Sequence, residues 1–395
     1  ASQDYPNFRP TLDFNFAAEK KLDPRITYSR TGPASFVNEF GKVVLVGDNA
    51  PRFDHDPITK ECKGLLIEES RTNFMKYSDE FAIDHGQTGG NWDAIGGESN
   101  YTRVSDTTET KDPTGITNHA SKLTLTGSSA TLRGYWYSGA VDGAVTKTYS
   151  VYLKRATSNT TTVSLDIGDQ AYTIFTLTDE WKRYSITTSS AGNGNFVDMH
   201  VHSGAGTAYY AWGAQIEAGS FATSYIPTSS AAVTRGADFA LIDGEEFTEF
   251  FNQDEGTIIT STNSLNTSAT QYPMVIEGDN TNNERHIFVE ANAYQYQIKD
   301  GGSTVAQIDA GSISTPKNII AAAYKLNDAA VSINGSDAAT DTSATMPTCT
   351  KLKLGHWSTT VYNGHINRFI YYSNKISNSQ LKTLSSYILY SIGRS

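Results

Sequence analysis

The sequence has almost no cysteine and little charge. Its 2 cysteines, Cys62 and Cys349, lie far apart among 395 residues. This spacing argues against a disulfide framework or a cysteine-based metal cluster, so we expect two isolated thiols. Charged residues make up 18%, below the usual quarter, with a net charge of −11. No cluster of Lys or Arg occurs, which argues against nucleic acid and an anionic membrane surface as partners.

Long apolar runs are also missing. The longest, at residues 319–323 and 43–46, are far too short to cross a bilayer, so we expect no membrane insertion. No signal peptide is visible. The chain begins at Ala1 and not at Met, and we expect a start that is processed or trimmed.

Aromatic residues are plentiful: 22 Tyr, 17 Phe and 5 Trp, beside 32 Gly. Aromatic content of this kind argues against disorder, and the sequence lacks the excess of Ala, Glu, Lys, Leu and Arg that is typical of a helical bundle. The length suggests two or three domains. An all-β protein that works outside a cell fits this composition best.

Residues 1–75 show little regular periodicity. Leu12, Phe14 and Phe16 alternate and predict a strand, residues 43–46 predict a second one, and an apolar piece lies at 64–67. The rest is rich in turn residues such as Asp-Pro and Gly-Pro. So few elements do not close a core of their own. We expect an extended N-terminal arm that packs on the following domain or on a neighbouring subunit.

Two further regions, 76–228 and 229–395, each contain strand-like segments separated by Gly, Asn, Asp and Ser turns. This pattern predicts two antiparallel β-sandwiches of the jelly-roll kind. In the first region the predicted strands are residues 120–125, 147–153, 161–167, 171–177, 181–187, 196–201 and 209–216. In the second they are residues 256–261, 274–277, 286–290, 294–299, 319–324, 330–333, 351–354 and 365–372.

A single short helix is predicted near the C-terminus. Ser377 and Gln380 form the S-x-x-Q pattern of a capping box. Leu381, Leu384 and Ile388 follow on one face. We expect this helix to close an open edge or the end of the second sandwich.

No catalytic constellation is evident. Cleavage of a glycan needs two carboxylates roughly 5–9.5 Å apart. Glu277-Gly278-Asp279 is the best match to the acid motif of laminarinase-type sandwiches, but its third acid is missing. No nucleophile elbow and no phosphate-binding loop is present. We therefore expect no catalytic residues and no enzymatic activity.

Two groups of residues are candidate metal ligands. His200 and His202 share one face of a predicted strand with Asp198, although a solvated strand face is the preferred interpretation. A candidate Ca²⁺ loop offers four oxygen donors, for which an Asn-rich turn is the preferred alternative: Asp279, Asn280, Asn282 and Glu284. We expect no metal and no other cofactor, with Ca²⁺ as the alternative. The cluster Asp54-His55-Asp56 is interpreted as a turn.

Tryptophan is the residue type that points most directly to sugar binding, because sugar rings stack on flat aromatic side chains. Trp181 and Trp212 fall in strand patterns and are assigned to packing. Trp92, Trp136 and Trp357 lie in turn-rich segments and are the candidate ligand-binding residues. We expect receptor contacts in loops of the two sandwiches and not in the arm.

Three stretches resemble known families. Residues 181–187 (WKRYSIT) and 209–228 (YYAWGAQIEAGSFATSYIPT) resemble the last strands of carbohydrate-binding-module-type jelly rolls in phage tail and virion proteins. Residues 323–336 and 354–384 resemble the laminin-G/concanavalin-type lectin sandwich. The arm pieces LDPRITYSR, PRFDHDP and CKGLLIEESRTNF resemble structural proteins of marine and cyanobacterial phages.

These resemblances imply a non-enzymatic virion appendage, such as a tail fibre, fibre or head-decoration protein. Its lectin-like domains would attach to glycans on the host surface. The implied partners are further copies of the chain, other virion proteins and a host-surface polysaccharide, and the implied location is the outside of the phage particle. Two alternatives stay open: a polysaccharide-degrading hydrolase or lyase with an attached binding module, and a purely structural virion scaffold.

The arm and the fibre resemblance together predict a homotrimer. An arm without a core of its own buries its apolar pieces, such as residues 64–67, on a partner. Light scattering at micromolar concentration should therefore give three times the mass of one chain. A mass equal to that of a single chain would contradict the prediction.

Overall fold

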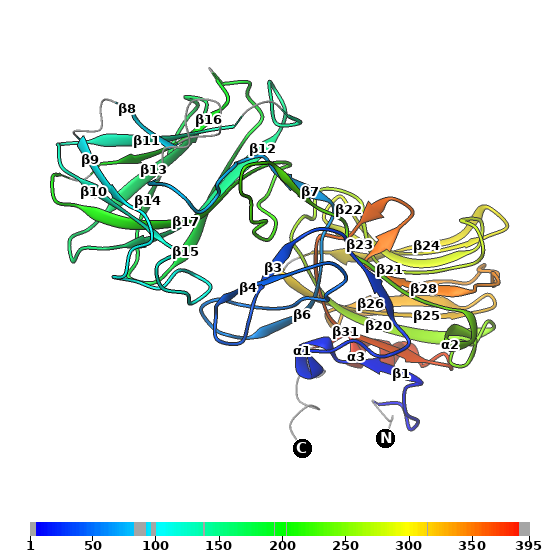
Figure 1. Cartoon of the computed structure of the whole chain (residues 1–395). Coiled ribbons are helices and arrows are strands. Elements are labelled where there is room, and N and C mark those ends of the chain that lie inside the picture. The colour runs from blue at the N-terminus through cyan, green and yellow to red at the C-terminus, as the bar shows by residue number, and fades with distance from the viewer. Residues whose placement is uncertain are drawn as a thin grey trace.

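The computed structural model describes residues 5–82, 92–95, 100–136, 139–192, 194–202, 204–313 and 315–386. Two β-sandwiches lie side by side (Figure 1). Strands account for 48% of the residues and helices for 5%, which confirms the predicted all-β fold. The helices in the described ranges are α1 (Phe16–Glu19), α2 (Gly244–Thr248) and α3 (Asn378–Leu384). None of the described helices is long and apolar enough to cross a membrane.

The jelly-roll sandwich consists of two five-stranded antiparallel sheets. The first, here the β12 sheet, has the order β15 (Lys182–Thr188), β12 (Lys147–Arg155), β17 (Ala208–Ala218), β10 (Ser121–Leu125), β9 (Tyr101–Val104). The second, the β13 sheet, has the order β14 (Thr173–Thr176), β13 (Thr162–Ile167), β16 (Phe196–Val201), β11 (Ala130–Tyr135), β8 (Trp92–Ile95). Alternate residues of the facing strands, such as Val151 and Leu165, fill one core.

The second sandwich pairs an eight-stranded with a seven-stranded sheet. The eight-stranded order is β27 (Ala339–Asp341), β26 (Ala329–Ile333), β25 (Lys317–Lys325), β20 (Glu255–Ser264), β31 (Gly364–Tyr372), β6 (Cys62–Ile67), β5 (Phe53–His55), with β1 (Leu12–Phe14) also on β31. The seven-stranded order is β2 (Thr27–Ser29), β19 (Phe239–Asp243), β28 (Lys351–Leu354), β21 (Gln271–Glu277), β22 (Glu284–Glu290), β23 (Ala293–Asp300), β24 (Ser303–Ser312).

Three two-stranded sheets complete the fold. The hairpin of β3 (Ala34–Val37) and β4 (Val43–Val46) lies beside the jelly roll. The pair β7 (Arg71–Asn73) and β18 (Val233–Arg235) joins the chain segments that enter and leave the jelly roll. The hairpin of β29 (His356–Trp357) and β30 (Thr360–Val361) contacts β21 of the seven-stranded sheet.

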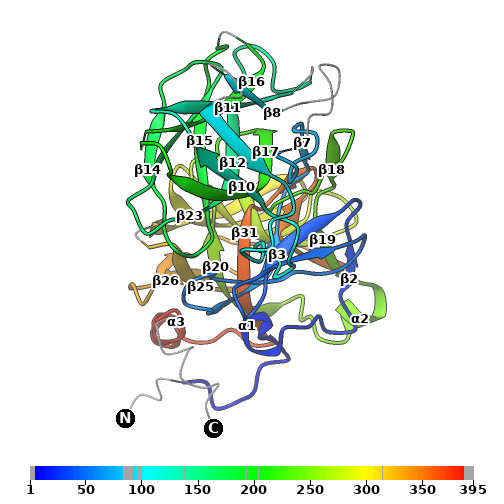
Figure 2. The same ribbon diagram turned by 60° about the vertical axis from the view of Figure 1, so that its left-hand side comes forward.

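Four strands of the N-terminal segment, β1, β2, β5 and β6, belong to the two sheets of the second sandwich, and this corrects the division into a separate arm and a C-terminal domain. β6 and β1 pair with successive halves of β31 and cover its edge. β2 pairs with β19, and the two lie side by side in Figure 2. Phe14, Phe16 and Leu65 lie in the same core as strands of the last region. A covered edge cannot pair with another chain. A role of this segment in oligomerisation stays a prediction.

The predicted C-terminal helix and the predicted free thiols are both confirmed. The Ser377 hydroxyl accepts the backbone N–H of Gln380, and the Gln380 side-chain oxygen accepts the backbone N–H of Ser377, which together form the capping box. Leu381 and Leu384 pack with Ile370 against the eight-stranded sheet, whereas Ile388 lies outside the described residues. Cys62 and Cys349 are not bonded to each other.

A buried ion network joins the N-terminal segment to the rest of the chain. The side chains of Arg30, Arg52, Arg235, Glu68 and Asp238 are at most 1% exposed. Arg52 lies 2.6 Å from both Glu68 and Asp238, Arg235 lies 3.1 Å from Glu68, and Arg30 lies 3.4 Å from Asp238. Burial alone would raise the pKa of Glu68, but the guanidinium groups of Arg235 and Arg52 hold it well below its ordinary value.

The same network reaches the jelly roll at Thr223 and Ser224. The backbone N–H of Ser224 donates to Glu68 Oε1 over 2.8 Å, and its hydroxyl donates to Oε2 over 2.7 Å. Ser224 lies in the exit segment after β17. The network therefore links three regions of the chain through hydrogen-bonded charges that water does not reach.

Removal of one member of the network should strongly destabilise the protein. Arg52→Met removes the 2.6 Å partner that Glu68 and Asp238 share and leaves each carboxylate with one more distant arginine. Because both carboxylates stay buried, we expect a loss of about 3–5 kcal/mol in the free energy of unfolding. Arg155→Met is the matched control, because Arg155 pairs at 2.6 Å with Asp179, which is 74% exposed. Its loss should stay below about 1 kcal/mol. Urea denaturation measures both, and equal losses would contradict the network's role.

Candidate functional site

The outer face of the seven-stranded sheet carries a group of aromatic and charged side chains. Along β22, Arg285, Ile287 and Val289 face inward, and the alternate residues Glu284, His286 and Phe288 face outward. The β29–β30 hairpin brings Trp357 onto these outward residues. Six residues, here called the Trp357 platform, form this group: Tyr272, Glu284, His286, Gln297, Lys299 and Trp357.

Trp357 is half-buried, and its indole contacts three neighbouring side chains. Its indole N–H donates to Glu284 Oε1 over 2.6 Å. Its ring centroid lies 5.0 Å from that of Tyr272, and the Lys299 ammonium lies 5.8 Å from the indole centroid. These contacts fix the orientation of the indole ring. Of the three tryptophans predicted to bind a ligand, this is the one that the structure leaves partly accessible.

Beneath the indole lie polar atoms with incomplete hydrogen bonding. Glu284 Oε2 is 3.2 Å from Lys299 Nζ and 3.6 Å from His286 Nδ1. Within the described part of the chain, neither Glu284 Oε2 nor His286 Nδ1 has a hydrogen-bond partner. His286 Nε2 is 2.9 Å from the Gln297 side-chain oxygen. Burial lowers the pKa of His286 to about 4, so the imidazole is neutral near pH 7.

The two carboxylates of the platform region are arranged as ion pairs. Glu277 and Glu284 are direct partners on neighbouring strands and face the same side. Glu277 pairs with Lys353 and Glu284 with Lys299. Asp279, the other acid of the predicted motif, instead accepts a bond from Thr350 over 3.0 Å. The sequence motif is therefore divided between a charged strand face and a turn.

Trp92 and Trp136, two of the three candidate ligand-binding tryptophans, are buried, and this corrects their assignment to ligand contacts. They are 1% and 2% exposed and lie in the jelly-roll core. Trp92 packs 4.6 Å from Phe81, and the Trp136 indole N–H donates to Asp142 over 3.0 Å. Trp92 begins strand β8 and Trp136 directly follows β11, although the sequence around both is rich in turn residues. Trp181 and Trp212 pack together with Tyr225, as predicted.

On the strand face considered as a metal site, His200 and His202 each use one ring nitrogen in a hydrogen bond. The rings share a face, with centroids 4.6 Å apart. His200 Nδ1 bonds to Thr131 over 2.6 Å, however, and His202 Nε2 to Ser164 over 2.9 Å. Asp198 is held by Arg133. The hydrogen-bonded strand face is thus the better description.

Asp198 instead meets two other carboxylates. Ligand atoms of Asp166, Asp169 and Asp198 lie within 4.8 Å of one another. Burial, with a contribution from Asp198, raises the pKa of Asp166 to about 6. Arg133 lies 2.7 Å from Asp198 and 3.0 Å from Asp169, and its guanidinium stacks 3.4 Å above the Phe196 ring centroid. This arginine offsets part of the negative charge.

The remaining acidic clusters are structural. Asp56 accepts the backbone N–H groups of Ile58 and Thr59, which confirms the predicted turn, whereas Asp54 and His55 belong to β5. Asn280 accepts the N–H of Asn282, as in the predicted Asn-rich turn. Glu284 lies in β22, so it does not share a loop with Asp279, Asn280 and Asn282.

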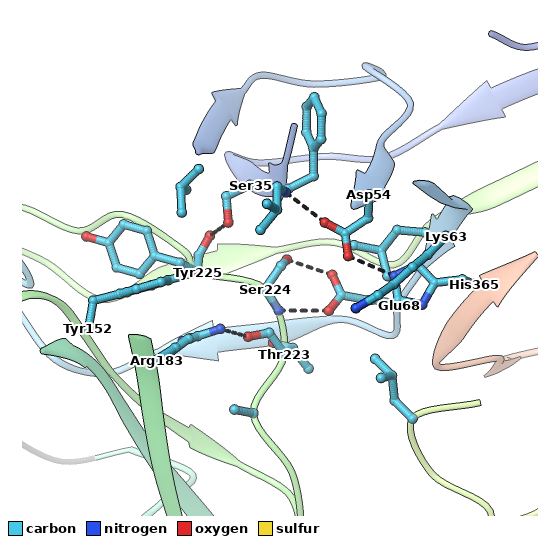
Figure 3. A pocket seen from close by; sticks show the side chains of 16 residues that line it. Ser35, Asp54, Lys63, Glu68, Tyr152, Arg183, Thr223, Ser224, Tyr225 and His365 are labelled. Carbon is cyan, nitrogen blue, oxygen red and sulfur yellow. Dashed lines mark hydrogen bonds and ion pairs between the residues drawn. The ribbon is translucent and has the colours of Figure 1, made fainter. Parts of the chain in front are cut away.

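A cavity that the sequence did not indicate lies where the two sandwiches meet. It has a volume of about 180 Å³. Ser35 and Asp54 from the N-terminal segment, Arg183 and Ser224 from the jelly roll, and His365 from β31 line it (Figure 3). Several stretches that resemble known families supply its lining, among them PRFDHDP with Asp54 and WKRYSIT with Arg183, but nothing in the sequence shows that they meet.

No protein-family model matches the sequence, and no curated protein matches it. Three solved structures illustrate the similarities to known folds. The Ruminococcus gnavus IT-sialidase CBM40 bound to α2,3-sialyllactose is 20% identical over 34% of this chain and 84% of its own, with a TM-score of 0.30. A leech intramolecular trans-sialidase is 16% identical over 37% of this chain and 27% of its own, with a TM-score of 0.32.

The binding domain of botulinum neurotoxin DC, in complex with rat synaptotagmin II, is 10% identical over 38% of this chain and 39% of its own, with a TM-score of 0.30. TM-scores of this size carry no argument about what the chain binds.

The different burial of the tryptophans predicts different effects of their removal. Trp136→Ala empties a core position and should lower the free energy of unfolding by about 3–5 kcal/mol. Trp357→Ala removes a half-buried ring and one hydrogen bond, for which we expect about 1–2 kcal/mol. Chemical denaturation of the two variants beside the wild type tests this order. A loss at Trp357 as large as that at Trp136 would assign this indole to packing.

Proposed function

We propose that the protein is a non-enzymatic virion appendage that attaches a phage to glycans on the host surface, and that the Trp357 platform contacts the sugar. The observation that carries the proposal is the fixed, half-buried indole beside Tyr272 on an outer sheet face. An aromatic ring that is held in place loses little conformational freedom on binding. Its partly accessible surface can cover the apolar face of a sugar ring.

The polar groups around the indole match the hydroxyl groups of a sugar. Gln297 and Gln307 are linked by a 2.9 Å bond between their side-chain amides, next to the Lys299 ammonium. A small number of fixed donors and acceptors beside aromatic rings is typical of sites for small polar ligands. Glu284 adds a carboxylate that orients the indole and has an oxygen without a hydrogen-bond partner in the described structure.

The virion location is supported by the arm resemblance. The three phage-like pieces contain Arg30, Arg52 and Glu68, which belong to the buried network. The stretches that resemble phage proteins thus include residues that form the buried ion network. Self-association as a trimer and contacts with other virion proteins belong to the same proposal.

A polysaccharide-degrading enzyme is the second candidate, because Glu277 and Glu284 lie side by side on one sheet face. We favour binding without cleavage, since both carboxylates pair with ammonium groups. Release of reducing ends from a host polysaccharide, lost in Glu277→Gln, would favour the enzyme.

A glycan array with the full chain tests the proposal. The wild type should bind at least one surface glycan, and Trp357→Ala should weaken that binding at least tenfold by removing the stacking surface. Trp181→Ala is the matched control, because Trp181 is also half-buried and its indole N–H donates to a backbone oxygen, that of Lys111, over 2.7 Å. The control should bind like the wild type.

Two results would contradict the proposal. Absence of binding to any glycan on the array, at concentrations where the chain is folded, would favour the purely structural scaffold. Equal binding by Trp357→Ala and the wild type would place the glycan elsewhere on the molecule.

A further inference from the structure

The cavity between the two sandwiches shares no residue with the Trp357 platform. Three parts of the chain line it: the N-terminal segment, the jelly roll and the second sandwich. Figure 3 shows Arg183 and His365 on opposite sides, with Ser224 and Glu68 between them. A molecule in this cavity would contact all three parts at once.

His365 presents an acceptor without a partner. Its Nε2 lies 2.8 Å from Asp54 Oδ2. A carboxylate only accepts, so Nε2 carries the hydrogen, and in the neutral ring Nδ1 is then an acceptor. His365 is 3% exposed, and its Nδ1 has no hydrogen-bond partner among the described residues.

Arg183 presents a donor without a partner. Its Nη1 donates to the Thr223 carbonyl over 2.5 Å and its Nη2 to Ser150 over 2.8 Å. Its Nε–H is buried and has no partner in the described ranges. No carboxylate of the described residues forms an ion pair with this guanidinium. The cavity lining thus includes an acceptor without a hydrogen-bond partner, His365 Nδ1, and on the opposite side a donor without one, Arg183 Nε.

The charges that line the cavity favour a neutral ligand. Glu68 is already engaged by Arg52, Arg235 and Ser224, and Asp54 accepts from Val37 and His365. Lys63 lies 3.4 Å from Asp56. The carboxylates of Glu68 and Asp54 would repel an anionic ligand. Lys63 and Arg183 would repel a cationic one. A hydroxyl group both donates and accepts, and it therefore matches both unmet atoms.

The size and the walls point to a single sugar ring. The volume of about 180 Å³ is many times the roughly 10–15 Å³ that a cavity needs to hold one water molecule. A ligand of monosaccharide size therefore fits. Tyr152, Phe36 and Leu66 supply apolar wall, and the Arg183 guanidinium lies 5.5 Å from the Tyr152 ring centroid.

We propose that this cavity is a binding site for one neutral polyol of monosaccharide size. The ligand bridges the jelly roll and the second sandwich through hydroxyl groups near Arg183 and His365. The site does not depend on the Trp357 platform, from which it differs in residues and in location.

Calorimetric titration of the full chain with D-glucose, D-galactose and D-mannose tests the proposal. N-acetylneuraminate and D-glucosamine serve as the anionic and cationic counterparts. We expect saturable 1:1 binding of at least one neutral hexose, tighter than that of either charged sugar. Ala222→Phe places a ring in the cavity wall and should weaken this binding at least tenfold. Ala231→Phe, at an exposed alanine, is the matched control and should bind like the wild type.

The titration is repeated in a Trp357→Ala background, which removes the stacking surface of the platform, so that the 1:1 binding that remains is that of the cavity. Thermal unfolding of Ala222→Phe shows whether the variant is folded, and the comparison of neutral with charged sugars needs no variant. Failure of all three hexoses to saturate the wild type would overturn the proposal. So would tighter binding of a charged sugar, unchanged binding by folded Ala222→Phe, or loss of binding in Trp357→Ala.

Discussion

Three buried guanidinium groups meet two buried carboxylates where the N-terminal segment, the jelly roll and the second sandwich come together. Charges without water are tolerated only when each has a partner in good geometry. Arg52 satisfies this condition by contacting Glu68 and Asp238 at 2.6 Å each. This buried network fixes the positions of three parts of the chain: β6, the exit segment at Ser224 and the strand pair β7–β18. The cavity lined by Arg183 and His365 lies against this network, since Glu68 belongs to both.

The sequence predicted many strands of the two sandwiches, although it missed β8, β9, β11 and the ten-residue β24. Strands at 196–201 and 351–354 agree with β16 and β28 to the residue, and the capping box at Ser377 is present. These elements have strong local signals, namely alternation and a cap. β1, β2 and β5 have three residues each, and the partner of β1 lies at the other end of the chain. The alternation at Leu12 and Phe14 predicts β1, but no local pattern shows which distant strand pairs with it, so the sequence predicts an arm and not a part of the sandwich.

The candidate site shows the same limit at the level of single residues. Trp92, Trp136 and Trp357 have similar turn-rich neighbours in the sequence. The difference between a core ring and a surface ring arises from tertiary contacts: Trp136 packs inside the jelly roll, whereas the β29–β30 hairpin lays Trp357 on an outer sheet face. The cavity could not be predicted either, because its lining comes from residues as far apart as Ser35 and His365.

The central claim is that the N-terminal segment is a structural part of the second sandwich, fixed by the buried network. Native-state hydrogen exchange of the full chain measures this directly. The amides of β6 that pair with β31 should open with the same free energy as those of β20, because the strands belong to one cooperative sheet. Exchange of the β6 amides at a much lower free energy than those of β20 would show a detachable arm and contradict the account.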